Sequence, residues 1–160
     1  MLKALSRSLA LLAITLVGCA GQPPPAAVSK PLDPSTAFLA QNAKRPEVVV
    51  TSSGLQYEVV HRGSGQMPTR SDRVRISYEG RLPDGEVFDR GHYGHERSIA
   101  VPLTNLIAGL VEGIQLMPAG STFTFYISSS LAYGDRGAGT KIGPGQALVF
   151  EVELLNIESP

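Results

Sequence analysis

The chain has 160 residues, a formal net charge of zero, 42% hydrophobic residues and one cysteine. This length and composition suffice for one domain with a real core plus short appendages. Zero net charge without a basic run argues against nucleic-acid binding, and a single cysteine excludes an intramolecular disulfide.

The first residues have the order of an export signal. Lys3 and Arg7 precede an apolar run at 9–17 that is too short to span a bilayer comfortably. The run ends in Leu-Val-Gly-Cys at 16–19, which resembles the lipobox of bacterial lipoproteins, in which the cysteine is diacylated and becomes the new N-terminus. We therefore predict a lipoprotein signal peptide at 1–18 and a bilayer anchor at acylated Cys19. An ordinary secretory signal followed by an unrelated cysteine is the alternative.

The residue after the cysteine is Ala20 and not Asp. In bacterial lipoproteins, a residue other than Asp directly after the acylated cysteine resembles the pattern that directs the protein to the outer membrane. The predicted location is the bacterial cell envelope, with the protein lipid-anchored in the outer membrane and facing the periplasm.

Residues 19–46 are expected to form a lipidated, proline-rich tether. Five prolines fall between positions 23 and 34, a composition typical of an extended, semi-rigid linker. Ser35 can cap a short helix that runs to about Asn42, although a continued linker is an equal alternative. Pro46 ends the segment in either case.

From residue 47 the apolar residues alternate with polar ones, which predicts β-strands. The predicted strands cover residues 48–51, 55–59, 73–79, 87–88, 99–103, 122–127 and 148–154. Asp84-Gly85 is a strong hairpin signal between two of them. In the last strand the acidic residues occupy one set of alternate positions, which therefore should face outward.

Residues 106–120 read as one short helix. Ile107, Leu110 and Ile114 form an apolar stripe, and Pro118 with Gly120 should end the helix. Two internal glycines, at 109 and 113, make it weak on propensity alone. It should therefore depend on packing against a large flat surface. The predicted fold is α+β, a curved antiparallel β-sheet wrapped around one short helix, with a ligand site in between.

Common catalytic patterns are poorly supported. The chain has no G-x-S-x-G turn, and Gly139-Thr140-Lys141 has the reverse of the order that a phosphate loop requires. His92, His95 and Glu96 lie in a segment without helical periodicity and lack a further placed ligand. Neither a metal nor a cofactor is predicted. The glycine-rich stretch 131–145 is the long loop in which functional residues are expected.

Several motifs follow one another in a characteristic order. They are Ser77-Tyr78-Glu79-Gly80, Asp84-Gly85, Phe88-Asp89, Leu106-Ile107 with Gly109 and Gly113, Gln115-Leu116-Met117-Pro118, Leu131-Ala132-Tyr133-Gly134 and Leu148-Val149-Phe150. Over about residues 35–158 the chain resembles the FKBP family of peptidyl-prolyl cis-trans isomerases. It is most similar to the bacterial branch that includes the macrophage infectivity potentiators.

The resemblance implies an isomerase domain at 47–160 that acts on proline-containing polypeptides without covalent chemistry. It implies catalytic roles for Tyr78, Asp89 and Tyr133. The substrate-binding residues that it implies are Phe88, Leu106, Ile107, Leu110, Ile142 and Phe150.

Two positions depart from the family pattern. Leu110 stands where relatives usually carry a tryptophan as the pocket floor, and Val101 stands where they often have phenylalanine. A deeper, less rigid floor should weaken the affinity for macrolide immunosuppressants more than it affects isomerisation. The short N-terminal helix, compared with the dimerising helices of related potentiators, favours a monomer. Alternative functions are a membrane-anchored chaperone-like module that binds proline-containing segments without efficient turnover, or a structural envelope lipoprotein.

Overall fold

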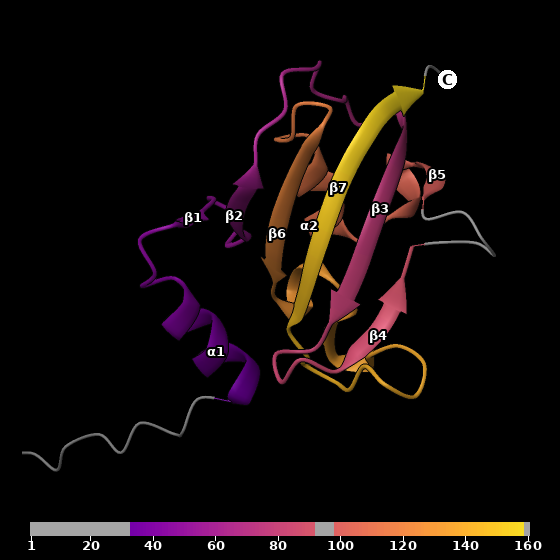
Figure 1. Cartoon of the computed structure of the whole chain (residues 1–160). Coiled ribbons are helices and arrows are strands. Elements are labelled where there is room, and N and C mark those ends of the chain that lie inside the picture. Colours follow the sequence, from indigo (N-terminus) through magenta and orange to yellow (C-terminus); the bar gives the residue numbers. More distant parts are fainter. Residues whose placement is uncertain (1–32, 92–97, 159–160) are drawn as a thin grey trace, which may run out of the picture. The chain divides into compact units, whose positions relative to one another are not determined.

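The computed structural model describes residues 33–91 and 98–158. In this part of the chain, seven antiparallel strands form one sheet with two α-helices beside it (Figure 1). The strands are β1 (Val48–Val50), β2 (Gln56–His61), β3 (Arg73–Arg81), β4 (Val87–Arg90), β5 (Ile99–Pro102), β6 (Ser121–Ile127) and β7 (Leu148–Glu158). The helices are α1 (Pro34–Asn42) and α2 (Ala108–Ile114). The predicted fold class is confirmed.

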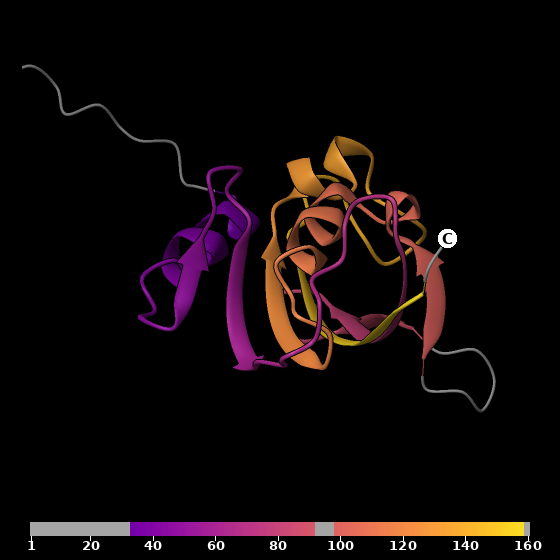
Figure 2. The same cartoon turned by 90° about the horizontal axis from the view of Figure 1, so that it is seen from above.

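The sheet is built around β7 and β3. The strand order is β1-β2-β6-β7-β3-β4. Strands β4 and β5 pair with the same edge of β3, β5 along its first half and β4 along its second half. The β3–β4 turn closes at Gly85, which has φ of +94°, and the Leu82 amide donates to the Glu86 carbonyl (2.8 Å). The predicted Asp-Gly hairpin is therefore present. Figure 2 shows that the sheet curves around α2.

The core fills the concave side of the sheet. On β7, Leu148, Phe150, Val152 and Leu154 are buried, and Glu151 and Glu153 are exposed between them. The predicted inward and outward faces of this strand are thus confirmed. Facing residues complete the core, namely Val74, Ile76, Leu110, Ile114, Phe123, Phe125 and Ile127.

Helix α2 is shorter than predicted. It begins at Ala108, because Ile107 has an extended backbone (φ −61°, ψ 151°), and it ends at Ile114. The next amides, of Leu116 and Met117, bond three residues back (3.0 Å each), so the chain tightens out of the α-helix well before Pro118. The prediction that Pro118 and Gly120 end the helix was wrong.

The two glycines of α2 lie where the helix touches β6. A Cβ at Gly109 would lie 2.5 Å from Ile127 Cγ2, and one at Gly113 would lie 2.4 Å from Phe125 Cε1. Such distances leave no room for a methyl group. The two glycines destabilise the isolated helix, but they allow α2 to pack closely against β6. This agrees with the expectation that the helix depends on packing.

Helix α1 is present, but its cap differs from the prediction. The Asp33 carboxylate accepts a hydrogen bond from the Thr36 amide (3.0 Å), so Asp33 and not Ser35 is the N-cap. The buried Ser35 hydroxyl instead accepts from the Ala147 amide (2.9 Å), just before β7. These bonds place α1 in the same compact unit as the sheet, Pro31–Pro160.

Packing of α1 explains an exception to the alternation of β6. Tyr126 alternates along β6 with the core residues Phe125 and Ile127, and yet it is only 8% exposed. The Phe38 ring of α1 lies 6.2 Å from the Tyr126 ring, and Arg45 donates to the Tyr126 hydroxyl (2.9 Å). The outer face of β6 is therefore covered at this point. Across 33–91 and 98–158, neither helix has the length and apolar character needed to cross a bilayer.

Candidate functional site

A cavity of about 430 Å³ opens between α2, the concave face of the sheet and the loop after β6. Its walls come from β3, β4, β7, α2 and the segments that flank α2 and the loop. The lining residues are Tyr78, Asp89, Asn105, Leu106, Ile107, Leu110, Ala132, Tyr133 and Phe150. The hollow is open, and both Leu110 and Phe150 lie in its wall without filling it.

The aromatic wall depends on a glycine in β3. Gly80 pairs with Phe150 across the β3–β7 ladder. A Cβ at Gly80 would lie 2.7 Å from the Phe88 ring and 2.9 Å from the Phe150 ring. The absence of a side chain allows these two rings to meet edge to face, with centroids 5.5 Å apart. Tyr78 packs against the other side of Phe150 at 5.8 Å.

One edge of the cavity carries a hydrogen-bonded polar pair. The Tyr78 hydroxyl donates to Asp89 Oδ2 (2.8 Å). The other carboxylate oxygen of Asp89 accepts from the Arg90 amide (2.8 Å). With both oxygens engaged, Asp89 is oriented beside the apolar wall as an acceptor.

Helix α2 contributes apolar side chains and one amide. Leu110 is 3% exposed and forms part of the cavity floor at the position where the family usually has tryptophan. Ile107 precedes the first helical residue, and its amide N–H has no acceptor within the described ranges. An N–H in this position can donate to a bound carbonyl group.

Tyr133 stands on the loop side of the cavity and is 40% exposed. Partial burial, and to a smaller extent the charge of Asp89, raises the pKa of Tyr133. Its hydroxyl is therefore protonated, and a donor, across the neutral range. The Gly145 amide donates to the Gly134 carbonyl (3.0 Å), which ties the residue after Tyr133 to the far end of its loop.

Seven of the nine predicted pocket residues line this one cavity, and Phe88 and Ile142 do not. Phe88 lies behind Phe150 and faces a separate shallow hollow beside Lys141. Ile142 is 9% exposed and belongs to the core. Both can act on the cavity only through their neighbours in this arrangement. Asn105 and Ala132 also line the cavity and were not predicted. Ala132 belongs to the Leu131–Gly134 motif, whereas the one signal for Asn105 was its position directly before Leu106.

Other predicted features lie outside the described residues. These are the signal peptide at 1–18, the anchor Cys19, the proline-rich stretch up to residue 32, and His92, His95 and Glu96. Within the described ranges, no group of three or more histidine, cysteine or carboxylate side chains is arranged to hold a metal ion.

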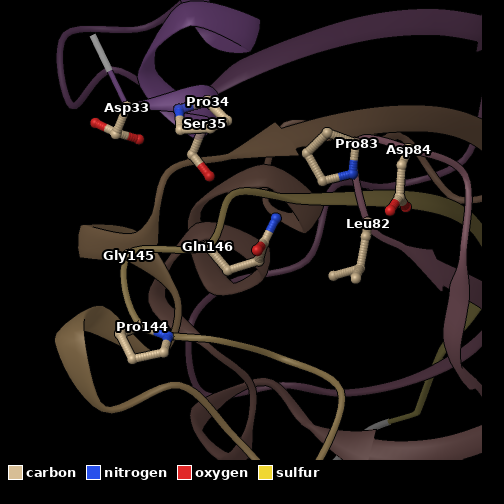
Figure 3. A pocket seen from close by; sticks show the side chains of 9 residues that line it. All are labelled: Asp33, Pro34, Ser35, Leu82, Pro83, Asp84, Pro144, Gly145 and Gln146. Atoms are coloured by element: carbon tan, nitrogen blue, oxygen red, sulfur yellow. The ribbon is translucent and has the colours of Figure 1, made fainter. Parts of the chain in front are cut away.

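A second cavity, of about 390 Å³, lies where α1 begins (Figure 3). It is lined by Pro34 and Ser35, by Pro83 and Asp84 of the β3–β4 turn, and by Pro144–Gln146. None of the predicted site residues reaches it, so it is distinct from the candidate site.

Comparison with known proteins gives two adjoining family matches. Residues 64–155 match the family described as FKBP-type peptidyl-prolyl cis-trans isomerase. Residues 25–59 match the domain described as amino terminal to that isomerase. The second match ends within β2, so it includes α1 and β1.

Individual relatives agree with the family matches. The chain is 48% identical over 124 residues to a probable FKBP-type peptidyl-prolyl cis-trans isomerase FkpA of Neisseria meningitidis, covering 78% of this chain and 45% of that protein. It is 40% identical over 122 residues to the outer membrane protein MIP of Legionella longbeachae, covering 76% and 52%. The chain spans about half the length of the curated relatives it matches.

A solved structure supports the same fold. The crystal structure of a peptidyl-prolyl cis-trans isomerase from Pseudomonas syringae pv. tomato superposes with a TM-score of 0.71 at 34% identity. The match covers 78% of this chain and 91% of that one.

Proposed function

This chain belongs to the family of FKBP-type peptidyl-prolyl cis-trans isomerases, in the branch similar to the macrophage infectivity potentiators, and we propose that it accelerates the isomerisation of X–Pro bonds in exported polypeptides. The observation that carries the proposal is the open cavity, which is lined by apolar and aromatic side chains and edged by the Tyr78–Asp89 pair and Tyr133.

The reaction requires rotation about an amide bond. Resonance keeps that bond planar and imposes a barrier near 20 kcal/mol, so an X–Pro bond left alone turns over in tens of seconds or longer. The twisted amide has lost resonance and carries less charge separation than the planar form. An apolar cavity therefore disfavours the planar ground state more than the twisted state, without any covalent step.

In this proposal the apolar walls hold the proline ring and exclude water. Leu106, Leu110 and Phe150 line those walls. A barrier reduction of about 5–8 kcal/mol accelerates the rotation by roughly four to six orders of magnitude. That reduction lies within what ground-state desolvation and a few oriented hydrogen bonds provide together.

The polar groups act on the carbonyls around the turning bond. The Ile107 N–H holds a substrate carbonyl, and the protonated Tyr133 hydroxyl donates to the carbonyl beside the twisting bond. Asp89 performs no acid–base step. It orders Tyr78 through their hydrogen bond and sets the polarity next to the twisting carbonyl.

We also propose that acylated Cys19 anchors the protein to a lipid bilayer and that residues 20–32 connect the anchor to the domain. The relative named as an outer membrane protein supports an envelope location. The anchor has a direct test. Cys19→Ser should abolish labelling by a fatty-acid analogue and move the protein from the membrane fraction to the soluble fraction. Unchanged labelling of this variant would refute acylation at Cys19.

The remaining proposals concern assembly and drug binding. We propose a monomer, because α1 has only nine residues. We also propose a macrolide affinity below that of relatives with a tryptophan floor, because the smaller Leu110 leaves the cavity floor deeper and less rigid.

The proposed function is tested with Asp89→Ala in a protease-free exchange assay on a blocked Ala-Pro peptide. We expect kcat/KM to fall at least about tenfold, which corresponds to about 1.4 kcal/mol of lost transition-state stabilisation. Asp84→Ala is the matched control, because Asp84 lies on the same hairpin but outside the cavity. Full turnover by Asp89→Ala would refute the site. Peptide binding by the wild type without turnover would instead support the chaperone-like alternative.

A further inference from the structure

A groove with a volume of about 630 Å³ lies beside α2. Residues of α2, the 3-10 turn before it and the segment before β3 line it. The groove is distinct from the cavity of the candidate site, with which it shares only Leu106. The residues that matter here are Arg70, Leu106, Glu112, Gln115, Leu116 and Leu131.

The groove adjoins the proline cavity. Leu106 lines both of them. Leu131 lines the groove, and the next two residues, Ala132 and Tyr133, line the cavity. A polypeptide with its proline in the cavity that continues past Leu106 therefore enters the groove. Three extended residues cover about 10 Å, so a short flanking segment is enough.

The groove offers an apolar floor with a polar rim. Leu106, Leu116 and Leu131 are half-buried, so each presents apolar surface to a ligand. The Gln115 amide is engaged by the Val111 carbonyl within the helix. This mixture of apolar floor and polar rim suits an extended peptide with alternating side chains better than a single small molecule.

The two charged side chains that line the groove, Glu112 and Arg70, differ in their hydrogen-bond and ion-pair partners. The Glu112 carboxylate accepts from the Thr51 hydroxyl (2.8 Å), which draws it toward the β1–β2 turn. Arg70 is exposed and makes no ion pair with any residue of 33–91 or 98–158. The groove thus carries one cation and one anion, and Arg70, which makes none of these ion pairs, is the group that can pair with an acidic side chain of a ligand.

We propose that this groove binds the segment of the substrate polypeptide that flanks the isomerised proline, and that it favours an acidic side chain opposite Arg70. The inference depends on the proposed isomerase function and adds a sequence preference to it. Exposed ion pairs contribute little each, so the preference is modest, about two- to fivefold in kcat/KM.

The test compares a blocked Ala-Pro tetrapeptide with longer peptides that carry three more residues on one side or the other. The added segment contains Glu, Gln or Lys at one position. Turnover is measured by exchange NMR on the full chain at low ionic strength and again at high salt. For one of the two extensions we expect kcat/KM of the Glu peptide to exceed that of the Lys peptide by about two- to fivefold, and high salt should reduce this ratio.

Two variants assign the effect to the groove. Arg70→Glu should reverse the ratio of Glu to Lys peptides. Arg62→Glu makes the same charge change at an exposed arginine that lines neither cavity, and it should leave the ratio unchanged.

The outcomes separate this inference from the proposed function. Equal turnover of the Glu and Lys peptides would overturn the proposal that the groove binds substrate, and so would a Glu-to-Lys ratio that Arg70→Glu leaves unchanged. In both cases, turnover of the short peptide would still support the proposed isomerase function. A ratio that Arg62→Glu changes as much as Arg70→Glu shows a long-range charge effect and also overturns the groove. Absence of turnover with the short peptide overturns the proposed function itself.

Discussion

Gly113 provides a sensitive test of how α2 packs, because two effects of Gly113→Ala oppose each other. Alanine in a helix interior is favoured over glycine by about 1 kcal/mol. The new methyl group, however, would lie 2.4 Å from Phe125 Cε1 and 2.8 Å from Cδ1 and Cζ of the same ring. Phe125 is fully buried in the core, so its ring cannot turn into solvent.

The steric effect should exceed the propensity effect. Overpacking a well-filled core costs about 1–3 kcal/mol, and a contact this short lies at the upper end. We expect Gly113→Ala to lower the free energy of unfolding by about 1–2 kcal/mol, after the helix gain is subtracted. In urea this moves the unfolding midpoint down by roughly 0.5–1 M with an unchanged slope.

Gly143 gives the matched control. A Cβ at Gly143 would meet nothing nearer than 4.0 Å, and its backbone does not need a positive φ. Gly143→Ala should therefore leave the unfolding midpoint unchanged or raise it slightly. Combining Gly113→Ala with Phe125→Leu should cost less than the sum of the two single changes, because the smaller side chain relieves the contact. A Gly113→Ala protein as stable as the wild type would contradict this account of helix packing.

Three further predictions concern the floor, the loop and the α1 contact. Leu110→Trp should fill part of the cavity and raise macrolide affinity at least about tenfold, or about 1.4 kcal/mol, in a calorimetric titration; unchanged affinity would show that the floor residue does not limit binding. Ser35→Ala leaves the buried Ala147 amide without its 2.9 Å acceptor and should lower the free energy of unfolding by about 1–3 kcal/mol, measured by urea denaturation. Because the pKa of Tyr133 is raised above its ordinary value of 10.0, activity that depends on its hydroxyl should be complete below that value and fall only as pH rises through the raised pKa. A pH profile of kcat/KM should therefore be flat from pH 6 to 9, within about a factor of two, and Tyr133→Phe should lose the alkaline decline; a decline near neutral pH would refute the role.

Much of the architecture follows from local patterns in the sequence. The alternation in β7 predicted its inward and outward faces, and Asp84-Gly85 predicted the β3–β4 turn. These features are local, because a strand face is fixed by a period of two residues and a tight turn by the conformations of its own residues. The family motifs added the expectation of a proline-binding pocket and of the residues that line it.

The remaining features depend on contacts between residues far apart in the chain. Ser35 was expected to cap α1, but its hydroxyl accepts from Ala147, a residue 112 positions away. Tyr126 alternates with the core residues Phe125 and Ile127 and is nevertheless buried, because Phe38 of α1 packs over it. Patterns along the sequence cannot show which element will cover an exposed position.

The site divides in the same way. The sequence by itself determined which residue types are available, namely apolar and aromatic side chains with a few hydroxyl and carboxyl groups. The tertiary structure alone decided that seven of the predicted residues share one cavity, whereas Ile142 enters the core and Phe88 lies behind Phe150. The physical reason is that a side chain reaches a cavity only if the curvature of the sheet and the position of α2 direct it there, and both are set by long-range packing.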